Sequence, residues 1–137
     1  MPLIHITLAG PAASPDTIYR LQRETTQLMQ DLLGKSAALT VVAVAQLPAG
    51  AYSANGRALV VAASMQATIT AGTNSAAEKA AFIAAATSLL VDVNGSGEAP
   101  VYVALHELPA ENWGYDGQTQ AARRALHASA EQIGGAA

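Results

Sequence analysis

The sequence has no cysteine, few aromatic side chains and little charge of either sign. Without cysteine among its 137 residues, the chain can form neither a disulfide nor a thiol nucleophile. Aromatic residues make up 4% and hydrophobic residues 51%, so alanine, valine, leucine and isoleucine must build the core. The net charge is −3 and no basic stripe is present, which argues against nucleic acid as a partner.

Long apolar runs are also missing. The longest mostly apolar stretches, 37–47 and 58–63, are too short to span a bilayer. The first residues lack the positively charged region of a secretory signal. His5, His106 and His127 show no metal-ligand spacing, so we expect neither a metal site nor a cofactor. These absences predict a soluble, cytoplasmic protein with no membrane partner.

A repeat organises the chain. The tripeptide Leu-Pro-Ala occurs twice, 61 residues apart, and at the same spacing Tyr52 matches Trp113. A fixed period over much of a chain is typical of a duplicated supersecondary unit. We therefore expect a single domain, 1–137, with pseudo-repeats of about 1–62 and 63–137, in which Met65 falls near the position of Pro2. The turn signals Asn55-Gly56 and Asp116-Gly117 also keep this spacing.

Each repeat is predicted to contain a strand, a helix, a strand and a hairpin. Ser14 and Ser75 are typical helix N-caps, and Gly34 is typical of a helix end. Two βαβ units predict an α/β fold with a four-stranded sheet and helices on one face. The expected strands are 2–8, 39–47, 65–71 and 101–108, the helices are 15–33, 76–93 and 119–133, and 94–97 forms a loop.

The predicted sheet leaves one face without helices. We expect this face to be apolar and buried between subunits, with Val42, Val44, Val103 and Leu105 as contributors.

Pro2 precedes an alternating apolar strand. An initiator methionine is usually removed before a small residue, and the mature chain would then begin with a secondary amine. An α-amino group has a pKa of about 7.7–8 in solution. Burial or a nearby cation lowers this pKa and leaves a neutral base. Alternatively, Pro2 only ensures methionine removal and begins an edge strand.

Pro2, the βαβ duplication and the run Glu-Leu-Pro-Ala-Glu-Asn-Trp-Gly at 107–114 resemble the tautomerase superfamily, typified by 4-oxalocrotonate tautomerase. Members with two fused units, such as malonate semialdehyde decarboxylase and cis-3-chloroacrylic acid dehalogenase, match this chain better in length. The resemblance implies the tautomerase fold, a homotrimer, and Pro2 as the catalytic acid or base.

The resemblance also implies a substrate pocket. Tyr52 and Trp113 fall where the family has an aromatic residue beside the proline; the alternative for each is core packing or a trimer contact. Tyr115 is a further candidate, although hairpin tyrosines are often only exposed. Arg57 follows the first hairpin turn and is either a surface charge or a ligand to a neighbouring subunit's pocket.

The family's carboxylate-binding arginines are absent. Positions 11–12, 41–42, 73–74 and 102–103 carry no arginine, and lysine does not replace its bidentate geometry. Arg123 and Arg124 are interpreted as structural, although Arg123 of an adjacent chain remains an alternative ligand. We therefore expect a dicarboxylate such as 2-hydroxymuconate to be a poorer substrate than a monoacid or neutral enol.

The predicted activity is enol–keto tautomerisation of a small enol or oxo acid, with Pro2 moving a proton at the carbon next to a carbonyl. One alternative is a decarboxylase or hydratase of small oxo acids from the same superfamily. A second is a non-catalytic protein with the tautomerase fold. Reaction of a small electrophile with the Pro2 nitrogen would distinguish an enzyme from an inert relative.

Overall fold

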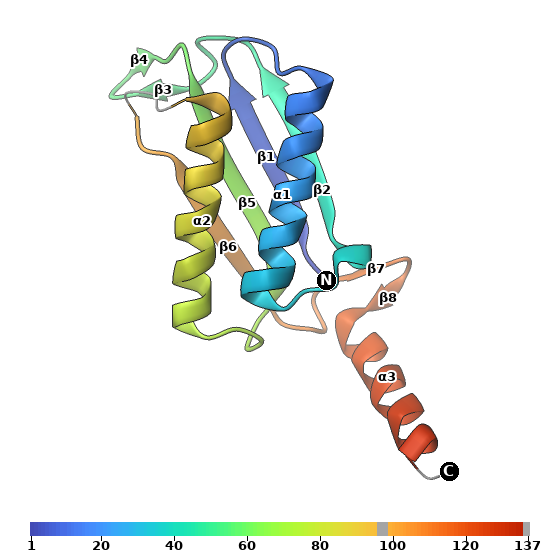
Figure 1. Cartoon of the computed structure of the whole chain (residues 1–137). Helices are drawn as coiled ribbons and strands as arrows, with labels where there is room; N and C mark the ends of the chain where they lie inside the picture. Colours follow the sequence, from blue (N-terminus) through green and yellow to red (C-terminus); the bar gives the residue numbers. More distant parts are fainter. Residues whose placement is uncertain (96–98, 136–137) are drawn as a thin grey trace.

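A four-stranded sheet forms the centre of the molecule (Figure 1). The computed structural model describes residues 1–95 and 99–135. The strand order is β2-β1-β5-β6, in which β1–β2 and β5–β6 are parallel and the central pair β1–β5 is antiparallel. The predicted pair of βαβ units is therefore present. The sheet strands are β1 (Leu3–Ala9), β2 (Val41–Leu47), β5 (Ala62–Thr70) and β6 (Tyr102–Leu108).

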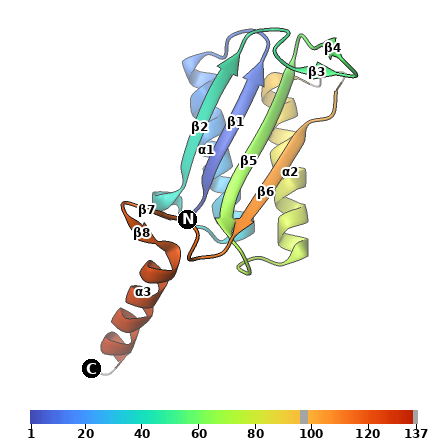
Figure 2. The ribbon, with the colours of Figure 1, turned by 180° about the vertical axis from the view of Figure 1, so that it is seen from behind.

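Two long helices cover one face of this sheet, as predicted. They are α1 (Pro15–Leu33) and α2 (Ala76–Asn94). Both begin with a serine cap: Ser14 accepts from the Thr17 backbone, and Ser75 forms a capping box with Glu78. Figure 2, seen from behind, shows the opposite face of the sheet without a helix.

The two units share one register. Leu3 lies opposite Val41, and Ser64 lies opposite Tyr102, 61 residues further along in both strands. This register aligns Pro2 with Ala63, two residues before Met65, which the sequence analysis placed near that position. Ala63 is buried and its nitrogen is a chain amide, which cannot act as a free amine.

Two small hairpins complete the units at opposite ends of the sheet (Figure 1). Each turns at a residue pair with positive φ, which favours Asn-Gly and Asp-Gly sequences. The turn pairs are Asn55-Gly56 and Asp116-Gly117, between β3 (Ser53–Ala54) and β4 (Arg57–Ala58), and between β7 (Gly114–Tyr115) and β8 (Gln118–Thr119).

The core lies between the helices and the sheet. Ile4, Ile6 and Leu8 alternate with outward-facing residues and are fully buried, as strand geometry requires. Aliphatic and aromatic side chains of the two helices cover them. These helix residues include Leu21, Met29, Phe82 and Leu90.

The composition predicted for the open face of the sheet is wrong. Val42, Val44, Val103 and Leu105 pack against the core, because their strand parity turns them toward the helices. The strand residues of the opposite parity form the open face, with polar side chains in the centre of the sheet and apolar side chains mainly at its edges. The open face includes His5, Gln66, Thr68 and His106, with Leu3, Val41, Leu47, Tyr102 and Leu108.

Some element boundaries also differ from the prediction. A short 3₁₀ helix, η1 (Ala37–Leu39), precedes β2, because Leu39 and Thr40 donate backbone hydrogen bonds to Ser36 and Ala37. In the second unit β5 begins three residues earlier than expected. Of the predicted loop 94–97, Asn94 belongs to α2, Gly95 caps it, and residues 96–97 lie outside the described residues.

The last helix, α3 (Gln120–Gly135), projects away from the sheet at the end where the N-terminus lies, as both views show (Figures 1 and 2). Its side chains Leu126 and Ile133 are 61% and 76% exposed. Within residues 1–95 and 99–135, no helix has the length and apolar character needed to cross a membrane.

Candidate functional site

Pro2 is buried at the start of β1. Its carbonyl accepts a hydrogen bond of 3.1 Å from the backbone of Val41, which fixes the entry into the strand. The chain end lies against a pocket of about 340 Å³. The lining residues come from the start of β1, η1, β2, the β7–β8 hairpin and the start of α3, and they include Pro2, Leu39, Val41, Trp113, Tyr115, Asp116 and Gln120.

The β7–β8 hairpin shapes one wall of the pocket around Pro2. Trp113 donates from its indole nitrogen to the Thr70 hydroxyl at 3.2 Å, which ties the hairpin to the end of β5. Gly114 allows the two hairpin strands to approach each other closely. A Cβ at this position would lie 1.9 Å from the Gln118 carbonyl oxygen, which is too close for any other residue. The backbone nitrogen of Gln120 then donates to the Trp113 carbonyl at 2.9 Å and joins the hairpin to α3.

A second pocket of about 570 Å³ adjoins the first. The two pockets share Met1, Leu39, Tyr115 and Gln120 as lining residues. Their charges differ: Asp116 is the only charged side chain of the first, whereas no carboxylate lines the second among the described residues. The second pocket is lined by the cations Lys35, Arg123 and Arg124, and by His127.

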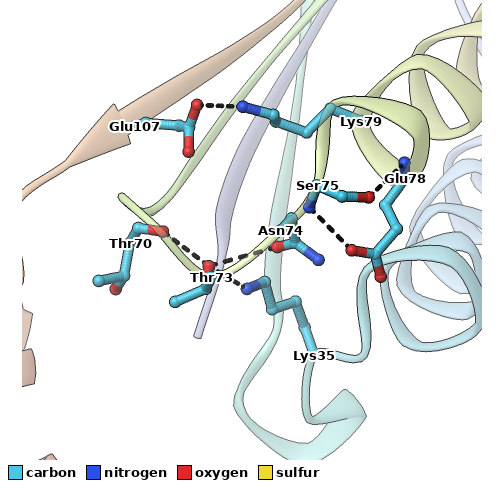
Figure 3. Close-up of polar contacts among 8 residues, drawn as sticks. All are labelled: Lys35, Thr70, Thr73, Asn74, Ser75, Glu78, Lys79 and Glu107. Carbon is cyan, nitrogen blue, oxygen red and sulfur yellow. Dashed lines mark hydrogen bonds and ion pairs between the residues drawn. The ribbon is translucent and has the colours of Figure 1, made fainter.

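Lys35 follows the end of α1 and reaches the loop between β5 and α2 (Figure 3). Its ammonium group donates to the Thr73 hydroxyl at 2.8 Å, and Thr73 donates to the Thr70 carbonyl at 2.7 Å. Burial lowers the pKa of Lys35, and the charge of Arg124 lowers it further, while Glu78 and Glu107 oppose the shift. Thr70 thus connects Lys35 with Trp113.

The two carboxylates near Lys35 have partners of their own. Glu107 pairs with Lys79 at 2.6 Å, a hydrogen bond that lowers the pKa of Glu107. Hydrogen bonds with Ser75 in the capping box lower the pKa of Glu78. Figure 3 shows both interactions on the side of α2. The cation of Lys35 is therefore not neutralised by a direct ion pair among the described residues.

Arg123 lies against Tyr115. Its guanidinium carbon is 3.6 Å from the centre of the ring, and one terminal nitrogen donates to the Tyr115 carbonyl at 3.1 Å. This geometry is a cation–π contact. Because Tyr115 lines both pockets, Arg123 is held at their boundary from within the same chain.

The amine at the chain start is affected by this environment. Burial lowers the pKa of the Met1 amino group, and the charge of Lys35 lowers it further. Both effects destabilise the protonated form. The Met1 amine is therefore shifted toward the neutral form, which is the form that can accept a proton.

The predicted site residues divide between the two ends of the sheet. Trp113 and Tyr115 lie with Pro2, but Tyr52 and Arg57 belong to the hairpin at the other end. Tyr52 hydrogen-bonds Ser64 at 2.8 Å and lines a separate pocket of about 260 Å³. Arg57 is exposed. Within one chain, neither can reach Pro2.

Sequence reasoning did not assign Lys35 or Gln120 to the site, and it interpreted Arg123 as structural. From the sequence we looked for arginine only at positions 11–12, 41–42, 73–74 and 102–103, whereas the structure brings cations next to the pocket from α3 and from the end of α1. Neither segment contains a sequence motif that predicts a position beside the pocket. Only the helix-ending Gly34 before Lys35 indicated that the lysine begins a connection.

The structure thus defines an α/β protein of two βαβ units with a pocket around the buried second residue. Residues 68–123 match the family model described as tautomerase enzyme. The match lies within the second βαβ unit, and solved structures of fused 4-OT proteins share the fold of both units. No curated protein sequence matches the chain.

Solved structures show the same fold. Pt0534 inactivated by 2-oxo-3-pentynoate has 21% identity and a TM-score of 0.79, over 88% of this chain and 98% of that one. The Q0 fused 4-OT symmetric trimer has 19% identity and a TM-score of 0.77, over 88% and 98%. A macrophage migration inhibitory factor-like protein from Entamoeba histolytica has 20% identity and a TM-score of 0.71, over 86% and 97%.

Proposed function

We propose that this protein is a tautomerase in which removal of Met1 frees the amine of Pro2. Pro2 then transfers a proton from the enol oxygen to the carbon next to the new carbonyl group. One observation carries the proposal: Pro2 is buried beside a mainly apolar pocket, at a chain end whose surroundings lower the pKa of an amine. A general base is most effective when its pKa lies near the working pH.

The reaction follows from the position of the amine. The neutral Pro2 nitrogen accepts the enol hydroxyl proton while the carbonyl forms, and the protonated nitrogen then donates that proton to the adjacent carbon. No proton is gained or lost overall. Trp113 and Tyr115 enclose the apolar part of the substrate. A small enol or oxo acid, without a cofactor, suits this site.

A covalent test examines the nitrogen directly. 2-Oxo-3-pentynoate carries an alkyne conjugated to a carbonyl, so a neutral amine can add to it. We expect one equivalent to attach to the Pro2 nitrogen of the mature protein, detected by intact mass and peptide mapping. Protein that keeps Met1 has an amide at Pro2 and serves as the control. Modification at other residues only, together with no turnover of phenylenolpyruvate, would refute the proposal.

We also propose that the chain assembles as a homotrimer. Solved structures with this fold include fused 4-OT proteins described as symmetric and asymmetric trimers. In this chain α3 extends from the sheet with Leu126 and Ile133 largely exposed. Exposed aliphatic side chains on a projecting helix favour a contact with another subunit. In such an assembly, Tyr52 or Arg57 could meet a site in a neighbouring chain.

A further inference from the structure

The pocket of about 260 Å³ at the other end of the sheet repeats the pocket around Pro2. It lies between the β3–β4 hairpin and the starts of β5 and β6. All but one of the residues that line the Pro2 pocket have a counterpart 61 residues away in the sequence that lines this pocket, and the exception is Asp116. Ala63 takes the place of Pro2, and Tyr52 takes the place of Trp113. The duplication has therefore kept the same hollow at both ends of the molecule.

The chemistry of the two pockets differs. The nitrogen of Ala63 is a chain amide, so the second pocket has no amine that could act as a base. Leu59 takes the place of Gln120, and no charged side chain lines the second pocket among the described residues. The first hairpin leads into β5, whereas the second leads into α3 and its arginines. Since a charge without a partner is costly to bury, the second pocket favours an uncharged ligand, and it can bind that ligand without converting it.

Two hydroxyl groups form the polar part of the second pocket. The Tyr52 Oη lies 2.8 Å from the Ser64 Oγ and 3.3 Å from the Thr7 carbonyl oxygen, to which it can donate. When Tyr52 donates to Thr7, Ser64 donates to Tyr52 and keeps a free lone pair. When Tyr52 donates to Ser64, the Ser64 proton is free. A ligand hydroxyl group matches both arrangements, because it can accept a hydrogen bond as well as donate one.

We propose that this pocket is a second, non-catalytic binding site for an uncharged compound that consists of one aromatic ring with a hydroxyl group. The volume suits such a ligand, since an engineered apolar cavity of about 150 Å³ binds benzene. Leu59, Val61 and Val101 line the pocket and contact the ring, while the hydroxyl group reaches Tyr52 and Ser64. The proposal does not depend on the tautomerase function, because it uses neither the Pro2 amine nor the cations beside it.

Titration of ¹⁵N-labelled full-length protein with 4-methylphenol, toluene and 4-methylbenzoate tests the site. The backbone amide signals of Ser53, Ala63 and Ser64 report on this pocket. The indole signal of Trp113, the only tryptophan in the sequence, reports on the Pro2 pocket.

We expect 4-methylphenol to shift the three amide signals. Toluene should bind about three- to tenfold more weakly, because it lacks the hydroxyl group and its hydrogen bond. 4-Methylbenzoate should leave the three signals unshifted, because its carboxylate finds no cation among the described residues that line the pocket.

Tyr52→Phe and Ser64→Ala each remove one hydroxyl group from the pocket. We expect each variant to lose most of the preference for 4-methylphenol over toluene, while its affinity for toluene stays within about twofold of the wild type. Tyr19→Phe is the matched control. Tyr19 belongs to α1, is 61% exposed and lines neither pocket, so this variant should keep the full preference.

Three results would overturn the proposal. The first is a shift of the Trp113 signal without shifts of the three amide signals, or no shift of any signal up to the solubility limit of 4-methylphenol. The second is binding of 4-methylbenzoate as tight as that of 4-methylphenol. The third is an unchanged preference in both Tyr52→Phe and Ser64→Ala, which would show that the two hydroxyl groups do not hold the ligand. Because the two substitutions lie in different elements, either one serves as the test if the other prevents folding.

Discussion

Replacement of Pro2 by alanine tests the proposed mechanism most directly. Pro2→Ala keeps a free amine at the chain start but changes a secondary amine into a primary one. General acid–base groups contribute about 10²- to 10⁴-fold to rate. We expect kcat for phenylenolpyruvate to fall by at least about 100-fold, equivalent to about 2.7 kcal/mol in the activation barrier.

The structure predicts that this loss is chemical rather than structural. The Pro2 carbonyl accepts from Val41 at 3.1 Å, and alanine preserves that backbone hydrogen bond. The substitution removes two buried ring carbons, worth about 1–2 kcal/mol of apolar burial. A change of this size lowers the midpoint of thermal unfolding by only about 2–8 °C.

The assay follows the decay of enol absorbance in mature wild-type and Pro2→Ala protein. Intact mass establishes that Met1 is absent from both, and circular dichroism gives the unfolding midpoints. A form that retains Met1 is expected to be inactive, because its Pro2 nitrogen is an amide. Equal activity in wild type and Pro2→Ala would refute the assignment of Pro2 as the acid or base.

Three further predictions follow from other parts of the structure. We expect kcat/KM to rise with pH as the Pro2 amine loses its proton. The charge of Lys35 lowers the pKa of the amine at the chain start, observed for Met1, so Lys35→Met should move this rise to higher pH. An unmoved pH profile would contradict the argument. If the chain forms the proposed trimer, Leu126→Ser combined with Ile133→Ser should weaken it in sedimentation, and an unchanged trimer would show that α3 does not contribute. Thr25→Val should stabilise the fold by about 1 kcal/mol in urea unfolding, because the fully buried Thr25 hydroxyl lacks a partner among the described residues; destabilisation would refute this.

Local signals in the sequence were enough to predict the two long helices, the four sheet strands and their repetition, although some boundaries differ. Ser14 and Ser75 begin the long helices, and the Asn-Gly and Asp-Gly pairs turn both hairpins. These signals succeed because caps and tight turns depend on a few neighbouring residues. The 61-residue period extended the same reasoning to the second unit.

The faces of the sheet and the composition of the site required the tertiary structure. Strand parity is ambiguous in apolar runs such as Val41–Leu47, and only packing against α1 shows that Val42 and Val44 face inward. The same packing ties residues far apart in sequence: Lys35 bonds Thr73, and Thr70 bonds Trp113.

The sequence by itself determined that the chain holds two βαβ units and that its second residue is a proline before a strand, because both are local or periodic features. The tertiary structure decided that Trp113 lies with Pro2 while Tyr52 lies at the opposite end, because the central strands are antiparallel. It also decided that cations adjoin the proline pocket, because the end of α1 and the start of α3 meet there. Contacts between such distant segments depend on the path of the whole chain, and no local sequence pattern encodes them.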